Sequence, residues 1–336
     1  MITPKAYYLC SQYHGSNKQL GSVAEHIFPE HETSALKVDL RTRAKLFFPF
    51  YELFIFLIGL FGADSHIAKF LKRIAMRGHI PVVNDSDVIV LKTPPFEYVA
   101  LLLAAGSKAK LFYIGSPKRV KSERFGELIS TPSTPCASAT VMLDMLPTEK
   151  SYAEYRERSE VFQGSRYALL LLGGDAKGYH YQSDDWVKIS NFVNNYSDIT
   201  GIKWVVSTSP RTGIDAEKIL KSQIDKNACE CFVCWGDGDR KTVFDCLTGA
   251  CEVFVTHDSA SMISEAINVR LPTIVIRPDK TEYNSLTVPL VDHMVSKRAA
   301  MDIKCSDLSL ESVGEWKNKE FKPINKCWVE AWERGD

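Results

Sequence analysis

The chain has 336 residues, of which 45% are hydrophobic and 24% are charged. These values are ordinary for a globular protein and exclude a disordered or collagen-like chain, and at roughly 150 residues per domain the length suggests two domains. The 41 Lys and Arg residues equal the 41 Asp and Glu residues in number. Because dedicated nucleic-acid-binding proteins are usually basic, we expect no nucleic acid among the partners.

The charges are distributed unevenly along the chain. Residues 1–150 contain 18 basic and 13 acidic side chains, a net charge of +5, and the remaining residues carry −5. A basic N-terminal half suits an anionic acceptor or a membrane surface, and a chance distribution is the alternative.

The cysteines and the N-terminus indicate the compartment. The nine cysteines are odd in number and several lie in apolar runs, which is typical of reduced thiols. Cys231 and Cys234 have no second pair of metal ligands nearby, so we expect no zinc site. No apolar signal segment follows Met1. We therefore expect a cytoplasmic protein, and the inner face of the cell membrane is one location that this would allow.

Apolar runs alternate with helical stretches, which predicts an α/β fold. In the first half, strands are expected at residues 6–10, 36–40, 87–91, 110–114, 127–130 and 140–143. Helices are expected at residues 20–27, within 50–77 and at 96–104. A turn-like segment at 146–150 and a charged stretch at 152–158 predict a domain boundary.

The second half continues the same alternation. Strands are expected at residues 167–172, 203–207, 231–235, 253–256 and 273–276, and helices at 183–194, 215–224, 241–248, 262–268 and 283–295. Continuous apolar runs predict parallel strands that are buried on both faces. The expected fold class is α/β, with two doubly wound Rossmann-like domains, 1–150 and 160–310, facing a cleft. The tail, 311–336, is short and apolar enough at its end to dock back on the N-terminal domain.

Residues 46–63 form an apolar stretch of about 18 residues, the lower limit for a membrane span. Pro49 and Glu52 interrupt this stretch, so a spanning helix is the least favoured of three interpretations. A helix buried in the N-terminal domain is the second. The third is a peripheral membrane contact, in which aromatic side chains reach the lipid boundary and the basic residues that follow contact head groups.

Two loops that follow predicted strands carry residues suited to phosphate. Gly173 and Gly174 allow backbone N–H groups to approach a phosphate, and Lys177 adds a positive charge. Ser209 and Arg211 follow the next strand, and an arginine presents a fork of donors to an oxyanion. The structural alternatives are a tight turn in the first loop and helix capping beside a solvated arginine in the second.

A third loop leads into a helix near Ala260. The free N–H groups at a helix start form an anion site, and Asp258 or Ser259 could cap this helix. Glu265 lies one to two turns further on, where its carboxylate can accept hydrogen bonds from both hydroxyls of a ribose. A purely structural segment is the alternative. Together the three loops suit a nucleoside diphosphate.

These loops resemble those of a known family. The second half is similar to the plant mitochondrial fission proteins named for elongated mitochondria and to their bacterial homologues, which are themselves similar to GT-B glycosyltransferases. The resemblance rests on Leu172–Gly174, on Thr208–Thr212 and, most specifically, on Asp258–Ala266. The N-terminal half matches more loosely and includes His14 in its first loop.

The resemblance implies a glycosyltransferase that moves a sugar from a nucleotide-sugar donor to a glycan or glycolipid acceptor. The donor site that it implies comprises Gly173, Gly174, Lys177, Ser209, Arg211, Asp258, Ser259, Ser261, Met262 and Glu265. His14 would deprotonate the acceptor, with a surface-loop histidine as the alternative. No cofactor or metal is expected, because a helix dipole and cations can stabilise the departing nucleotide. A non-catalytic adaptor, as in the organelle-fission members, and a sugar-nucleotide hydrolase or epimerase are the alternative functions.

Overall fold

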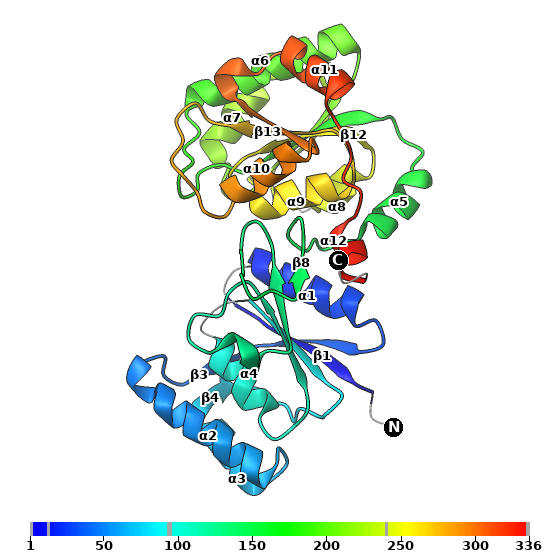
Figure 1. Cartoon of the computed structure of the whole chain (residues 1–336). Coiled ribbons are helices and arrows are strands. Elements are labelled where there is room, and N and C mark those ends of the chain that lie inside the picture. Colours follow the sequence, from blue (N-terminus) through cyan, green and yellow to red (C-terminus); the bar gives the residue numbers. More distant parts are fainter. Residues whose placement is uncertain (1–2, 12–13, 93–95, 239–240, 334–336) are drawn as a thin grey trace. The chain divides into compact units, whose positions relative to one another are not determined.

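The computed structural model describes residues 3–11, 14–92, 96–238 and 241–333. The chain forms two compact units (Figure 1). The first comprises Met1–Leu143 together with Trp328–Asp336, and the second comprises Asp144–Cys327. The chain thus changes unit just ahead of the turn-like segment at 146–150, and residues 311–327 of the tail belong to the second unit.

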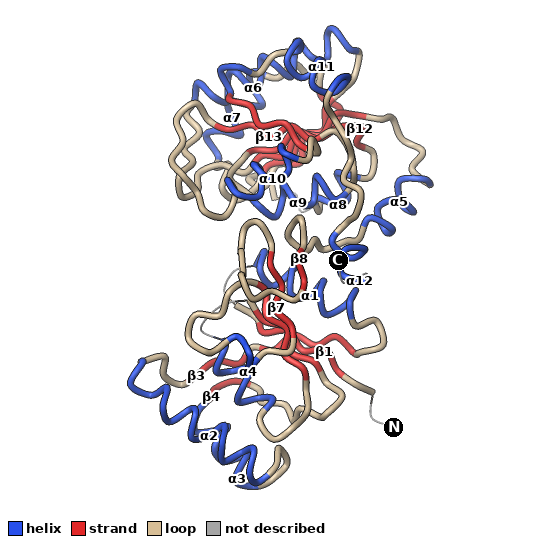
Figure 2. The backbone as a smooth tube through the Cα atoms, in the orientation of Figure 1, coloured by secondary structure: helices blue, strands red, loops and turns tan. Residues whose placement is uncertain are grey.

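A parallel six-stranded sheet forms the centre of the first unit (Figure 2). Its strands lie in the order β2 (Glu32–Leu36), β1 (Lys5–Leu9), β5 (Val88–Leu91), β6 (Lys110–Ile114), β7 (Glu127–Ser130) and β8 (Val141–Met142). The helices are α1 (His14–Ile27), α2 (Phe48–Phe61), α3 (His66–Ala75), α4 (Glu97–Ala104) and α12 (Trp328–Glu333), with short 3-10 turns at Lys45–Phe47 and Ser122–Arg124. The strand predicted at 36–40 is divided, because Leu36 ends β2 and β3 (Val38–Leu40) pairs antiparallel with β4 (Met76–Gly78).

The helical region predicted within 50–77 is a hairpin of two helices. Helix α2 ends at Gly62, whose φ of +87° is readily adopted only by glycine. Ser65 then caps α3, because its hydroxyl accepts a hydrogen bond from the Ala68 N–H at 3.0 Å. The same hydroxyl donates to the Gly62 carbonyl at 2.9 Å, which fixes the turn between the helices.

The second unit contains a second parallel six-stranded sheet. Its strands lie in the order β11 (Cys229–Val233), β10 (Trp204–Thr208), β9 (Tyr167–Leu172), β12 (Ala250–Thr256), β13 (Thr273–Arg277) and β14 (Ala300–Lys304). Its helices are α5 (Tyr152–Glu160), α6 (Ser183–Thr200), α7 (Ile214–Gln223), α8 (Val243–Leu247), α9 (Ala260–Asn268), α10 (Val288–Ser296) and α11 (Leu310–Lys319), with a 3-10 turn at Cys305–Asp307. Helices α6, α7 and α11 lie on one side of this sheet and α8, α9 and α10 on the other (Figure 1).

Both sheets are doubly wound, which confirms the predicted α/β class with two Rossmann-like domains. The strand order reverses between β1 and β5 in the first unit and between β9 and β12 in the second. At such a point the loops that follow the two neighbouring strands diverge to opposite faces, and a crevice opens at the carboxyl ends of the strands.

Aromatic side chains fix the central strands of the second unit. The ring centroids of Trp204 on β10 and Phe254 on β12 lie 4.8 Å apart, and Phe192 of α6 lies 5.5 Å from Phe254. All six residues of β9 are buried, as expected for a central strand that is covered on both faces. The loops at the ends of these strands therefore start from rigid positions.

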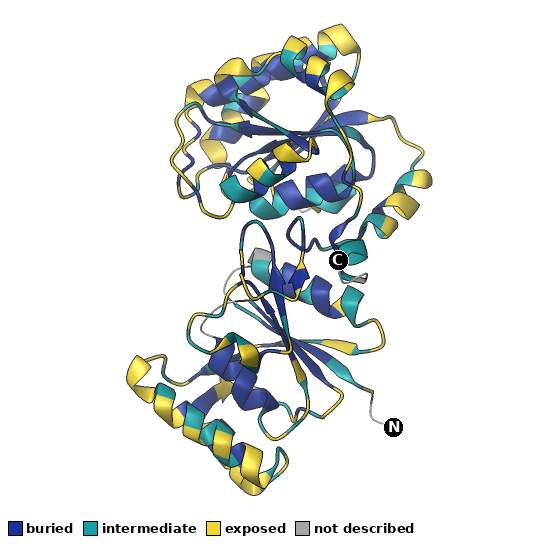
Figure 3. Ribbon diagram, viewed as in Figure 1, coloured by how far each residue is buried: buried dark blue, intermediate teal, exposed yellow. Residues whose placement is uncertain are grey.

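Residues 46–63 do not form a buried helix. Tyr51 and Ile58 of α2 are buried, whereas Phe56 and Leu60 are 66% and 67% exposed. Figure 3 shows exposed residues along both α2 and α3. In the part of the chain that the structure describes, no helix combines the length and hydropathy that crossing a bilayer requires.

The end of the chain packs within the first unit. Trp328 of α12 is 1% exposed, and its ring meets that of His26 on α1 edge to face with centroids 5.6 Å apart. Trp332 lies with its ring centroid 6.1 Å from that of Phe112 on β6. Burial of these apolar side chains explains why the last helix leaves the second unit.

Candidate nucleotide-binding site

The three loops singled out in the sequence leave neighbouring strands of the second unit. Gly173 follows β9, Ser209 follows β10 and His257 follows β12, all at the carboxyl ends of parallel strands. Strands β9 and β12 flank the point where the strand order reverses. Ligands of open α/β sheets bind at such a point, so the sheet topology brings the three loops to the expected place.

The two glycines after β9 are required by close contacts. A Cβ atom on Gly173 would lie 2.1 Å from Oδ2 of Asp258, and the Gly173 N–H donates to Oγ1 of Thr256 at 2.6 Å. Gly174 has a φ of +152°, and its Cβ would lie 2.1 Å from the carbonyl oxygen of Arg211. The glycines therefore let the loops after β9, β10 and β12 pack against one another, which a tight turn alone would not require.

An ion pair joins the second and third loops. A terminal nitrogen of Arg211 lies 2.8 Å from Oδ2 of Asp258, and the Asp258 side chain is 0% exposed whereas that of Arg211 is 40% exposed. Burial raises the pKa of Asp258, and the positive charge of Arg211 opposes that rise. Asp258 is thus an internal counterion, and the Arg211 side chain remains partly open to solvent.

Thr212 completes the packing of the second loop. Its hydroxyl oxygen lies 2.9 and 2.5 Å from the carbonyl oxygens of Leu172 and Gly173, respectively, which share its single proton. The same hydroxyl accepts the N–H of Ser209 at 3.0 Å. The Ser209 side chain accepts the N–H of Arg211 at 3.3 Å, so Ser209 shapes the loop that carries Arg211.

Helix α9 begins directly after the third loop. Ser259 is its N-cap residue by position, with extended φ and ψ of −124° and 96°, but it is buried and its side chain makes no capping hydrogen bond. The first N–H groups of a helix have no acceptor within that helix. Ser261 and Glu265 are partly exposed and four residues apart, so they share one face of α9. Met262 is also partly exposed. The helix start thus combines amide donors, hydroxyls and a carboxylate.

Lys177 lies on the outer part of the first loop. Its side chain is exposed, and its carbonyl accepts a hydrogen bond from the Asn284 amide at 2.6 Å. The next carbonyl, that of Gly178, accepts the N–H of Glu282 at 2.9 Å. These bonds connect the loop after β9 to the loop after β13. They fix the backbone at Lys177, from which its side chain can reach an anion.

A buried titratable group that the sequence patterns do not indicate lies beside this site. His257 is 3% exposed, and its ring centroid lies 5.0 Å from that of Tyr179. Burial lowers the pKa of His257 to about 4, so its ring is neutral at pH 7. Its Nε2 lies 3.8 Å from Oδ1 of Asp302 on β14, and burial raises the pKa of Asp302 to about 6. A titratable residue directly after a buried strand was the available signal.

The carboxyl end of the first sheet also carries polar residues, His14 and the pair of Lys92 and Gln19. His14 is the first residue of α1, and its side chain lies outside the described part of the structure. Lys92, which follows β5, donates to Oε1 of Gln19 on α1 at 2.5 Å. Burial lowers the pKa of Lys92 to about 8. This lysine, which the sequence analysis also missed, lies where the strand order of the first sheet reverses.

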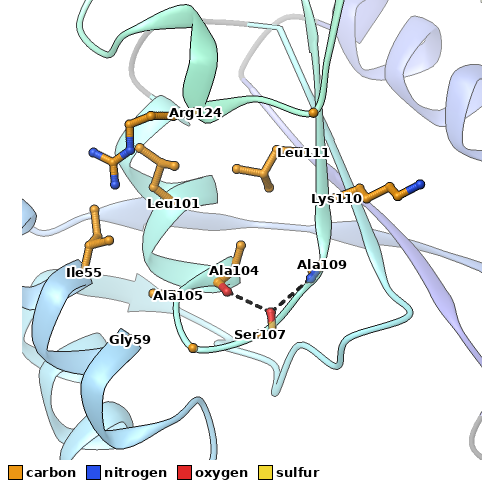
Figure 4. A pocket seen from close by; sticks show the side chains of 12 residues that line it. Ile55, Gly59, Leu101, Ala104, Ala105, Ser107, Ala109, Lys110, Leu111 and Arg124 are labelled. Carbon is orange, nitrogen blue, oxygen red and sulfur yellow. Dashed lines mark hydrogen bonds between the residues drawn. The ribbon is translucent and has the colours of Figure 1, made fainter.

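A hollow of about 380 Å³ opens elsewhere in the first unit, beside α2 and α4 (Figure 4). Ile55, Leu101 and Leu111 line it, with Lys110 and Arg124 at its edge. Lys110 starts β6, so the hollow is at the amino end of the sheet, opposite to the end at which such sheets bind ligands. Among the described residues, no three His, Cys, Asp or Glu side chains are grouped as metal ligands.

Comparison with solved structures identifies proteins with a similar fold. A Listeria monocytogenes protein assigned as a UDP-N-acetylglucosamine 2-epimerase is 9% identical with a TM-score of 0.55, over 99% of this chain and 95% of that one. The UDP-GlcNAc 2-epimerase of Methanocaldococcus jannaschii is 14% identical with a TM-score of 0.50, over 98% of both chains. An ADP-heptose LPS heptosyltransferase II from E. coli is 9% identical with a TM-score of 0.49, over 94% of this chain and 97% of that one.

The two doubly wound sheets define an α/β protein of the GT-B-like class. The sequence model of the family described as Mitochondrial fission ELM1 matches residues 145–327, more than half of the chain. The chain belongs to this family. The matched residues correspond closely to the second unit, Asp144–Cys327, which carries the three loops. No curated protein sequence matches the chain significantly.

Proposed function

We propose that the second unit binds a nucleotide sugar and that the protein is a GT-B-type glycosyltransferase. The observation that carries this proposal is the packing of Gly173 and Gly174 against the Arg211–Asp258 pair, beside the N-terminus of α9. A diphosphate needs amide donors and cations that converge on one point. The start of α9 would supply the amides and Arg211 the positive charge, whereas the N–H of Gly173 is already bonded to Thr256, so the two glycines serve to bring the loops together. The named substrate of the structurally similar epimerases, UDP-GlcNAc, is also a nucleotide sugar.

Each residue of the proposed donor site has a role that follows from its position. The N–H groups at the start of α9, with Ser259 and Ser261, would bind the diphosphate together with the exposed part of Arg211 and with Lys177. Glu265, one turn beyond Ser261 on the same face, would accept the two ribose hydroxyls. Met262 would contact the ligand through its apolar side chain. Asp258 and Ser209 would act indirectly, by holding Arg211.

The proposed reaction transfers the sugar to a hydroxyl group of a glycan or a glycolipid. The acceptor oxygen forms a bond to the anomeric carbon while the bond from that carbon to the phosphate oxygen breaks, and the nucleotide leaves with the electron pair. The helix dipole and Arg211 would stabilise the negative charge of the leaving nucleotide. In an inverting reaction His14 would take the proton of the acceptor hydroxyl, a role that rests on the family resemblance.

The Glu265→Gln variant tests the donor site. A hydrogen bond to a charged group contributes about 1.5–3 kcal/mol, so we expect at least a tenfold weaker affinity for the nucleotide that binds the wild type best, among UDP, GDP, ADP and CDP. Affinity is measured by calorimetry, and melting without ligand is measured on the same variant. Glu311→Gln, on an exposed residue of α11 in the same unit, is the matched control.

The 2′-deoxynucleotide identifies what Glu265 contacts. It lacks one ribose hydroxyl, so the wild type should bind it more weakly than the ribonucleotide, and Glu265→Gln should reduce that difference. Equal weakening of both nucleotides would contradict the ribose assignment. A lower melting temperature without ligand, together with unchanged affinity, would make Glu265 a structural residue of α9.

Membership of the Mitochondrial fission ELM1 family supports a second candidate function, a non-catalytic adaptor on the same scaffold. Incubation with the donor alone and with a mixture of glycan acceptors separates the possibilities. A transferase consumes the donor only with an acceptor, a hydrolase releases sugar without one, and an epimerase changes the sugar but retains the nucleotide. An adaptor leaves every donor intact.

A further inference from the structure

The apolar hairpin face is an exposed hydrophobic surface on α2, α3 and the turn before α2. Of the nineteen large hydrophobic residues exposed in the described chain, ten lie in this one segment. They are Leu46, Phe47, Phe50, Leu53, Phe56, Leu60, Phe61, Ile67, Phe70 and Ile74. Single exposed hydrophobic residues are common on proteins, but a concentration of this kind marks an interaction surface.

The opposite side of the hairpin is firmly attached to the first unit. Ile58 of α2 and Ala68 of α3 are 0% exposed, and the hydroxyl of Tyr51 donates to the carbonyl of Thr42 at 2.7 Å. The ammonium group of Lys72 donates to the carbonyl of Leu103 on α4 at 3.0 Å. The hairpin is therefore held in place while it presents its other side, and the exposure does not come from a detached helix.

Positive charge surrounds the apolar hairpin face. Residues 41–79 contain seven Lys and Arg residues but only two Asp and Glu residues, a net charge of +5. Six of the seven are exposed: Arg41, Arg43, Lys45, Lys69, Arg73 and Arg77. Arg43 and Arg77 are paired with Asp39, just ahead of this segment, at 2.6 and 3.4 Å. On α3, Lys69 and Arg73 form a basic row next to the apolar row of Phe70 and Ile74. This arrangement of an apolar row beside a basic row is typical of helices that lie in a lipid interface.

Helix length excludes a crossing. At 1.5 Å per residue the 14 residues of α2 extend about 21 Å, less than the roughly 30 Å of a hydrocarbon core. A second copy of the chain would bring the same net charge of +5 against itself, which opposes pairing through this surface. An anionic bilayer surface offers both the apolar layer for the phenylalanines and the negative charge for the basic residues.

We infer that the apolar hairpin face docks in the plane of an anionic lipid bilayer, with α2 and α3 lying in the interface. This extends the contact expected for residues 46–63 to the whole hairpin and assigns the basic row of α3 a role in it. The docking does not depend on the proposed donor site, because the hairpin belongs to the first unit and the donor loops to the second.

Co-sedimentation of the full chain with vesicles tests this inference. Vesicles of phosphatidylcholine with 30% phosphatidylglycerol should bind the protein at least tenfold more tightly than pure phosphatidylcholine, and 0.5 M NaCl should weaken the binding. The triple variant Phe50→Ser, Phe56→Ser, Leu60→Ser should lose at least tenfold in binding. The matched control replaces three exposed apolar residues of the second unit, Val161→Ser, Ile199→Ser, Ile214→Ser, and should bind like the wild type.

Two further measurements keep the result decisive. The double variant Lys69→Gln, Arg73→Gln should lose most of the preference for the anionic vesicles. Phe56→Trp retains the apolar surface, and its fluorescence should be quenched by brominated lipids, which reports insertion even if the serine variant folds poorly. Unchanged vesicle binding by the serine variant, no quenching of the introduced tryptophan, or a dimer in lipid-free solution that the serine variant dissociates would each overturn the inference. Nucleotide affinity should be the same in all of these variants.

Discussion

The guanidinium group of Arg211 lies 2.8 Å from the carboxylate of Asp258, at the place where a side chain on residue 173 would otherwise stand. The two residues come from loops after different strands, and only Arg211 is partly exposed. Asp258 therefore serves as the fixed counterion that orients Arg211, and Gly173 is the residue that leaves room for its carboxylate.

The two members of the pair should respond differently to replacement. Arg211→Ala leaves a carboxylate buried without its counterion, and we expect the free energy of unfolding to fall by about 3 kcal/mol. Asp258→Asn leaves only a partly exposed guanidinium, which water can solvate, and should cost about 1 kcal/mol. Urea denaturation at pH 7 and pH 5 checks this, because burial raises the pKa of Asp258 and the loss in Arg211→Ala should therefore be smaller at the lower pH. Equal losses at both pH values would contradict a buried carboxylate.

Alanine at position 173 should be poorly tolerated. Its Cβ would lie 2.1 Å from the Asp258 carboxylate. We therefore expect Gly173→Ala to lower the free energy of unfolding by about 2 kcal/mol or more, and by less if Asp258 moves. Combination with Asp258→Ala should recover part of the loss. Gly314→Ala is the matched control: that helical glycine of α11 has nothing within 4 Å of its Cβ, and alanine there should stabilise by about 1 kcal/mol. A tolerated alanine at 173 would show that the loops pack less closely.

His257 should make the second unit sensitive to acid. Its pKa is about 4 in the folded protein and 6.5 without burial, so the unfolded chain binds the additional proton as the pH falls from 6.5 towards 4. Stability is therefore lost in this window, by about 2–3 kcal/mol between pH 7.5 and 4.5. The stability of wild type relative to His257→Gln should fall by that amount across the window. His180→Gln, at an exposed histidine of the same unit, should show no such difference. A pH-independent difference for His257→Gln would contradict a buried neutral ring.

Lys72 should lower the stability of the folded protein at neutral pH, because its ammonium group is buried. Burial lowers its pKa from 10.5 to about 8, so the folded state bears an unfavourable charge below pH 8 that is relieved as the pH rises towards 10.5. We expect Lys72→Met to raise the free energy of unfolding at pH 7. Removal of the buried charge should add up to about 3 kcal/mol, and loss of the hydrogen bond to Leu103 should subtract about 1 kcal/mol. The gain should disappear near pH 10. Exposed Lys69→Met is the control and should show no comparable pH-dependent gain. A destabilised Lys72→Met protein at pH 7 would mean that the hydrogen bond outweighs the burial of the charge.

The sequence by itself determined the fold class and most of the central strands. The run Tyr167–Leu172 is apolar throughout, and only a strand covered on both faces needs such a run, so β9 was predicted with its observed bounds. Polar loops after such strands then marked the edge of the sheet where ligands bind. Strand β14, Ala300–Lys304, lies at the edge of the sheet, and the sequence patterns do not indicate it because Asp302 and Lys304 interrupt its apolar residues and only Ala300 and Ile303 are buried.

Only the tertiary structure decided which side chains are covered and which are paired. Helix α2 is apolar on every side, so its sequence contains no periodicity that distinguishes the attached face with Ile58 from the exposed face with Phe56. The Arg211–Asp258 pair and the burial of His257 depend on how loops from separate strands meet, which local sequence does not encode. Sequence patterns record the environment of each element, whereas contacts between elements arise only when the sheet brings distant loops together.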